Sequence, residues 1–256
     1  MKLARLSDKD FDRVKRDYPV SKLCPTCDDT QSYLLHDETH VCSCLDQKNL
    51  QKHYFASNIG RRYHSLSLAD FDTEDAPRIR VTVEQYLTDF DSNYRYGMGL
   101  VFYGGLGTGK TLVACHILKE LIKRGYSTYF IQFDDLIDTW GKRWADDDAC
   151  AFLEGKLKRS EVAVIDDMKT DKRNLERFLE AGLEAVVRYR YNNSLPTIVT
   201  TNLTIDQQMV EFPRVFSLLT AVNDWIEMKN ARDYRPNEYR DRLEYLRERH
   251  ETLPIV

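Results

Sequence analysis

The fold of this chain is decided by the stretch Leu100-Val101-Phe102-Tyr103-Gly104-Gly105-Leu106-Gly107-Thr108-Gly109-Lys110-Thr111. It combines an apolar run, the pattern G-x-x-x-x-G-K-T and the start of a helix. Glycines let the backbone curl so that its N–H groups surround phosphate oxygens. Lys110 can reach the β- and γ-phosphates, and the Thr111 hydroxyl can bind Mg²⁺. The motif stands in the strand-then-helix context it requires, so the sequence predicts a nucleoside triphosphate bound by residues 104–111.

Three further runs, residues 128–132, 162–165 and 197–200, also have the character of strands. They are apolar on both faces, as strands of a parallel sheet covered by helices must be. The helix after the phosphate loop is expected to reach Arg124 and to end at Gly125. The chain is therefore predicted to be α/β, a doubly wound αβα sandwich with its phosphate site at the carboxyl ends of the strands.

Acidic and amide side chains follow two of these strands. Asp166 and Asp167 come directly after residues 162–165, where Asp166 would hold Mg²⁺ and Asp167 would polarise the attacking water. A cap for the next helix is the alternative. Asn202 follows the fourth strand and could reach between the γ-phosphate and that water, or could simply form a turn. Together with the phosphate loop, the acids indicate hydrolysis rather than binding alone.

Arginines further along the chain are candidates to meet the γ-phosphate. These are Arg214 and the pair Arg232 and Arg235. The guanidinium group offers fixed, bidentate donors that suit this task. With 37 Lys and Arg residues in the chain, a solvated surface arginine is the competing interpretation.

The N-terminal region carries a candidate zinc site. Four of the six cysteines form two close pairs, Cys24 with Cys27 and Cys42 with Cys44. Zinc takes four soft ligands at tetrahedral corners, and a segment with so few apolar residues needs such a staple to fold. The second pair is C-x-C rather than C-x-x-C, so His36 and His40 are alternative ligands, and four thiols without metal remain a further alternative. The favoured interpretation is structural Zn²⁺.

Composition sets the remaining bounds. The chain has 256 residues and a net charge of −4, so any DNA contact must come from a local patch. There is no apolar run long enough to span a bilayer and no signal sequence, which predicts a cytoplasmic protein without membrane contact. We expect a zinc-binding, partner-docking domain at 1–50, a connecting segment that caps the nucleotide pocket at 51–97, and an ATPase domain at 98–256.

Two local features bear on ligands. In the connecting segment, the turn from Ile59 to Tyr63 could lie over an adenine base, and residues 81–90 read as an amphipathic helix. The interleaved aromatic and basic residues from Trp140 to Trp144 fit the stacking and phosphate contacts of single-stranded DNA binding. A helix end with buried tryptophans is the alternative. A second basic cluster is Lys169, Lys172 and Arg173.

The motifs in this order resemble the DnaC/DnaI/IstB group of AAA+ ATPases, which contains replicative helicase loaders and transposition ATPases. The upstream cysteine pairs make the chain most similar to the loader branch. By that resemblance, Asn202 is the sensor 1 residue and Arg235 the sensor 2 arginine. The family's arginine finger position looks to be occupied by Leu218, so either Arg214, one turn earlier, substitutes or hydrolysis is slow.

The resemblance implies an ATP-dependent loader that deposits a hexameric replicative DNA helicase on single-stranded DNA during replication initiation and uses hydrolysis as a switch. Self-association through the ATPase domain is expected with it. One alternative is a transposition-regulating ATPase that assembles on DNA and recruits a transposase. A weakly hydrolysing ATP-binding scaffold is the other.

Overall fold

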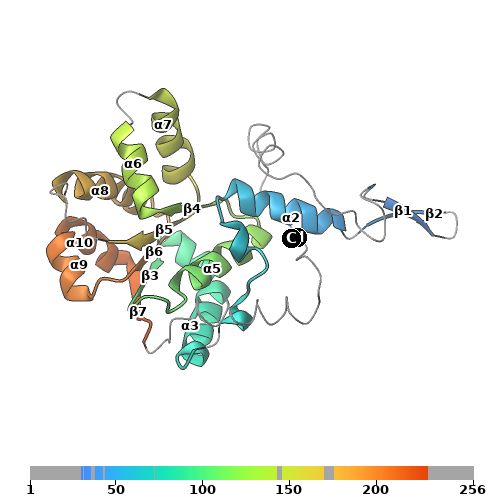
Figure 1. Ribbon diagram of the computed structural model, residues 1–256, viewed down its shortest axis with the longest axis horizontal. Helices are drawn as coiled ribbons and strands as arrows, with labels where there is room; N and C mark the ends of the chain where they lie inside the picture. Colours follow the sequence, from blue (N-terminus) through green and yellow to red (C-terminus); the bar gives the residue numbers. More distant parts are fainter. Residues whose placement is uncertain are drawn as a thin grey trace, which may run out of the picture.

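The computed structural model describes residues 30, 32–35, 38–42, 44–71, 73–142, 146–169 and 176–229. A five-stranded sheet lies at its centre (Figure 1). The strands are β3 (Gly99–Tyr103), β4 (Thr128–Gln132), β5 (Val162–Met168), β6 (Thr197–Thr201) and β7 (Asn223–Glu227). They are all parallel, in the order β4-β5-β6-β3-β7. The predicted αβα fold is confirmed, and so are its four predicted strands.

Helices cover both faces of the sheet (Figure 1). They are α2 (Cys44–Ala56), α3 (Ala76–Thr88), α4 (Phe90–Arg95), α5 (Lys110–Arg124), α6 (Phe133–Lys142), α7 (Asp147–Phe152), α8 (Glu176–Asn192), α9 (Ile205–Glu211) and α10 (Pro213–Val222). Short helical turns lie at Arg61–Tyr63, Leu68–Asp70 and Leu153–Lys158. As predicted, α5 ends at Gly125, whose φ of 97° is left-handed.

Successive strand residues face two separate hydrophobic cores. Leu100 and Phe102 of β3 point toward α3, α4 and α5, whereas Val101 points toward α6, α8 and α10. Residues of β5 and β6 alternate in the same way. Burial on both sides explains why these strands are continuously apolar. Strand β7 was not predicted because an edge strand reading Asn-Asp-Trp-Ile-Glu lacks that signal.

The segment 51–97 packs into the first of these cores. Ile79 and Val83 of α3 and Phe90 of α4 are fully buried there beside α5. The predicted helix at 81–90 was wrong in its bounds, because the helical stretch runs from 76 to 88 and is followed by α4. Val81, the first residue of the predicted helix, is 62% exposed. The burial pattern therefore starts one turn earlier than the sequence indicated.

The N-terminal part of the described chain is a two-stranded antiparallel hairpin, β1 (Ser32–Leu35) and β2 (Glu38–Val41), at the far end of α2 from the sheet (Figure 1). His40 stacks on Tyr33 across the hairpin, with ring centroids 5.7 Å apart. Cys42 is buried, and Cys44 begins α2. No three metal-ligating side chains come together among the described residues, and Cys24, Cys27 and His36 lie outside them. Nor is any described helix long and apolar enough to cross a bilayer.

Candidate active site

The phosphate loop joins the end of β3 to the start of α5. Gly107 and Gly109 have φ angles of 72° and 84°, and Gly104 has 138°. A Cβ on Gly104 would stand 2.3 Å from the Met228 carbonyl oxygen, so the end of β7 closes against the loop. These backbone angles are open to glycine and strained for other residues. Glycines with positive φ angles are the backbone that a phosphate-binding loop uses.

A phenylalanine from the preceding segment backs this loop. The ring of Phe71, which is 3% exposed, would lie 2.7 Å from a Cβ on Gly109. The main chain around Phe71 is fixed in turn by Arg80 of α3, whose guanidinium donates to the carbonyls of Leu68, Ala69 and Phe71. Residues 68–71 therefore act as a rigid wall behind the start of α5.

Gly109→Ala is expected to weaken ATP binding about tenfold or more, because it combines a left-handed backbone with a clash against Phe71. Gly155→Ala is the matched control, because a Cβ there meets nothing within 4 Å. Titration with a fluorescent ATP analogue measures both. Equal affinities in the two variants would contradict the role of this wall.

Lys110 lies inside the loop and is 7% exposed. Its ammonium donates to the carbonyls of Gly104 at 2.9 Å and Gly105 at 2.6 Å, and to Thr108 Oγ1 at 3.1 Å. The side chain is therefore curled over the loop that would hold phosphate oxygens. To contact a bound phosphate, this ammonium would have to exchange these oxygen acceptors for phosphate oxygens.

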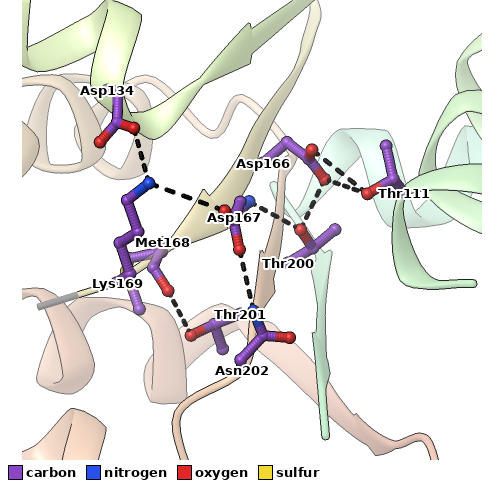
Figure 2. A network of polar contacts seen from close by, with 9 residues as sticks. All are labelled: Thr111, Asp134, Asp166, Asp167, Met168, Lys169, Thr200, Thr201 and Asn202. Carbon is purple, nitrogen blue, oxygen red and sulfur yellow. Dashed lines mark hydrogen bonds and ion pairs between the residues drawn. The ribbon is translucent and has the colours of Figure 1, made fainter. Parts of the chain in front are cut away.

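Thr111 and Asp166 are brought together across 55 residues of sequence (Figure 2). The Thr111 hydroxyl contacts Asp166 Oδ1 at 2.9 Å and Oδ2 at 3.2 Å. Burial raises the pKa of Asp166, while hydrogen bonds from Thr200 and Thr111 act in the opposite direction. Proteins usually hold Mg²⁺ through one or two carboxylates together with substrate phosphates and water. The Asp166 carboxylate beside the Thr111 hydroxyl fits this kind of site.

The two acids of β5 point in different directions. Asp167 has a left-handed φ of 57°, and the pairing of β5 with β6 shifts between Ile165 and Met168. Such a bulge re-aims a side chain. Asp166 consequently faces Thr111, whereas Asp167 faces the end of β6, where Asn202 Nδ2 donates to its Oδ1 at 2.9 Å (Figure 2).

Thr200 connects these two halves, and sequence reasoning did not assign it a role. Its hydroxyl donates to Asp166 Oδ1 at 2.6 Å and accepts from the Asp167 amide at 2.9 Å. Thr201 links the ends of β6 and β5 as well, because its hydroxyl donates to the Met168 carbonyl at 2.6 Å. Three of the five residues of β6 are threonines, so nothing in the sequence distinguishes Thr200 from Thr197 or Thr201.

Asp134 and Lys169 border Asp167 on its other side. Lys169 Nζ is 2.6 Å from Asp134 Oδ2 and 3.8 Å from Asp167 Oδ2 (Figure 2). Asp134 lies in the first turn of α6, directly after β4, the neighbouring strand of β5. Neither contact was predicted, because the sequence does not show which strand neighbours β5.

Ile59 and Tyr63 are fixed by the core and by α5. The Ile59 side chain is 2% exposed and belongs to the core, so contact with an adenine would fall to the Gly60 turn and Tyr63. The buried Lys119 of α5 donates to the carbonyls of Tyr63 at 2.7 Å, His64 at 3.3 Å and Leu66. This ammonium fastens the turn to the helix that begins at the phosphate loop.

The described members of the predicted arginine and DNA-contact sets lie on different elements of the fold. Arg214 pairs with Glu184 at 3.2 Å on the surface of α8 and α10, while Leu218 packs against the core. Trp140 is half-buried and packs against the core beside Gly182, which fits the alternative of a packing tryptophan at a helix end. Lys142 is exposed at the end of α6, and Lys169 follows β5. Six further members of these predictions lie outside the described residues, namely Arg143, Trp144, Lys172, Arg173, Arg232 and Arg235.

Comparison with known proteins gives consistent similarities. Residues 29–232 match the family described as IstB-like ATP binding protein. The chain is 27% identical over 204 residues to the phage-like element PBSX protein XkdC of Bacillus subtilis (strain 168), covering 72% of this chain and 73% of that one. It is 36% identical over 109 residues to an ATP-binding protein of insertion sequence IS5376 from Geobacillus stearothermophilus, covering 40% and 39%.

Among solved structures, the crystal structure of the DnaC helicase loader matches with a TM-score of 0.58 and 26% identity, covering 66% of this chain and all of that one. The crystal structure of DnaI shares the fold with a TM-score of 0.57. The predicted resemblance to this group of AAA+ ATPases is thereby confirmed.

Proposed function

The chain belongs to the IstB-like ATP-binding protein family, and from this premise we propose that it is an Mg²⁺-dependent ATPase that deposits a replicative DNA helicase on single-stranded DNA. The reaction is ATP plus water giving ADP and phosphate, used as a switch between a gripping and a releasing state. The observation that carries the hydrolytic part is the continuous hydrogen-bonded chain from Thr111 through Asp166, Thr200 and Asp167 to Asn202.

Each residue of this hydrogen-bonded series has a role in the proposed reaction. The loop glycines and Lys110 would bind the triphosphate, and Thr111 with Asp166 would hold Mg²⁺, which would supply charge neutralisation. Asp167 orients the attacking water, and Asn202 holds Asp167 in place through the 2.9 Å hydrogen bond. Positioning and charge stabilisation account for catalysis of this kind, without a covalent intermediate.

Two arginines complete the proposed site. Arg235 is the sensor 2 arginine, and Arg214 reaches the ATP of a neighbouring copy in place of a finger at the Leu218 position. The Arg214 side chain is 70% exposed, so it is accessible to such a copy. Because Leu218 occupies the usual finger position, we expect turnover to be slow.

The N-terminal region is proposed as the helicase-docking domain, with Zn²⁺ held by Cys24, Cys27, Cys42 and Cys44. Residues 51–97 cap the nucleotide pocket, and residues 98–256 form the ATPase domain. We propose a cytoplasmic location, with single-stranded DNA contacted by basic residues such as Lys169.

A double change of Cys24→Ser and Cys27→Ser is expected to abolish capture of the replicative helicase and lower bound zinc, while ATP affinity stays the same. The reason is that two of the four zinc ligands are removed far from the phosphate loop in sequence. Pull-down of purified helicase and elemental analysis measure the two effects. Cys150→Ser, in α7, serves as the control. Unchanged helicase capture would refute the docking role.

The 36% identity to the insertion-sequence protein supports a second candidate, a transposition ATPase that recruits a transposase. Affinity capture from host lysate with a slowly hydrolysed ATP analogue separates the two. A replicative helicase as main partner supports the loader, whereas a transposase supports the alternative. If neither is captured and single-stranded DNA leaves ATP turnover unchanged, an ATP-binding scaffold is favoured.

A further inference from the structure

Two carboxylates share one ammonium beside the proposed hydrolytic site. Lys169, the residue after β5, contacts Asp134 at 2.6 Å and Asp167 at 3.8 Å (Figure 2). The two acids come from different strand ends, since Asp134 follows β4 and Asp167 lies within β5. The two acids therefore compete for one ammonium, and movement of that ammonium toward Asp134 takes it away from Asp167.

Asp167 carries one hydrogen bond and one longer ion pair on its carboxylate, and both of its side-chain contacts are half-exposed. Oδ1 accepts from Asn202 at 2.9 Å, and Oδ2 faces Lys169. A carboxylate that orients a water needs an oxygen whose lone pair accepts from that water. A positive charge 3.8 Å from Oδ2 stabilises the carboxylate electrostatically and so makes it a weaker acceptor for a water, without occupying its lone pair. The left-handed backbone at Asp167 keeps the side chain in this position.

We propose that Lys169 is a positioning residue that restrains Asp167, and that Asp134 opposes this restraint by attracting the same ammonium. This inference rests on the proposed function, because it assigns a regulator to the same hydrolytic group. The strength of the restraint depends on the distance between the start of α6 and the end of β5. A displacement of α6 that moves Asp134 away would tighten the hold on Asp167 and slow hydrolysis.

The proposal makes predictions of opposite sign for two neighbouring residues. Lys169→Met is expected to raise kcat about twofold to fivefold, the range for one half-exposed ion pair. Asp134→Asn is expected to lower kcat by a similar factor, about twofold to fivefold, because the released ammonium turns to Asp167. The double variant should behave like Lys169→Met, since Asp134 acts only through the lysine.

Steady-state ATP turnover of the full chain tests these predictions, with KM measured alongside kcat. KM is expected to stay constant, because the phosphate loop lies on the Asp166 side of the bulge. Lys169→Arg keeps the charge and should restore the wild-type rate. The control pair is Lys123→Met and Glu120→Gln, an exposed ion pair on α5 whose loss should leave turnover unchanged.

A purely structural ion pair would give shifts of the same sign, or none, in Lys169→Met and Asp134→Asn, and either result overturns the inference. Its failure is distinguishable from failure of the proposed function. If the wild-type chain turns over ATP and Asp167→Asn stops it while these variants do not differ, only the restraint is refuted. If the wild-type chain shows no turnover with Mg²⁺, under any partner or DNA condition, the hydrolytic function itself is refuted.

Discussion

Asp167→Asn is expected to lower ATP turnover by about 10²- to 10⁴-fold, the usual contribution of a positioned acid–base group. The amide keeps the shape of the side chain and can still accept from Asn202 through its oxygen. It is a much weaker acceptor for the attacking water, so the loss falls on the chemical step. Binding of ATP should stay unchanged, because Asp167 faces away from Thr111 and the phosphate loop.

Phosphate release measures the rate, and equilibrium titration with a nucleotide measures the affinity. Asp206→Asn is the control, an exposed acid in the first turn of α9. A variant that binds ATP but turns over like the wild type would move the water-orienting role to another group. A variant that loses ATP binding instead would place Asp167 in the nucleotide site and contradict the geometry proposed for the bulge.

Arg190→Met is expected to lower the free energy of unfolding by about 3–5 kcal/mol, since several buried carbonyl groups each lose a donor at about 1–3 kcal/mol apiece. The side chain is fully buried in α8. Its guanidinium donates to the carbonyls of Leu157 at 2.9 Å, Ser160 at 2.8 Å and Pro196 at 2.8 Å. Arg190 thereby connects the segments that precede β5 and β6.

The buried charge itself is costly, and burial lowers the pKa of Arg190 to about 9. Urea unfolding followed by circular dichroism measures the effect. Arg188→Met is a closely matched control two residues away, because Arg188 is half-exposed and pairs only across the helix surface with Glu184. That change should cost about 0.5 kcal/mol. Equal midpoints for the two variants would show that Arg190 does not brace the sheet.

Much of the site is visible in the sequence because its groups lie within a few residues of a recognisable strand end. The phosphate loop, Asp166 and Asp167 are of this kind, and parallel strands bring such ends to one edge. Asn202 was found in the same way. Residues such as Thr200 carry no comparable local signal, because a threonine in a strand is ordinary until its neighbour is known.

The sequence by itself determined the parallel sheet, the phosphate loop and the acids beside it, since local periodicity and motif spacing encode them. Only the tertiary structure decided that Asp167 turns away from Asp166, that Lys169 lies between two acids, and that Trp140 packs against the core. The physical reason is that these features depend on the register of β5 against β6 and on where α6 and α8 rest on the sheet. Such long-range contacts are set by packing of the whole chain, and no short stretch of residues specifies them.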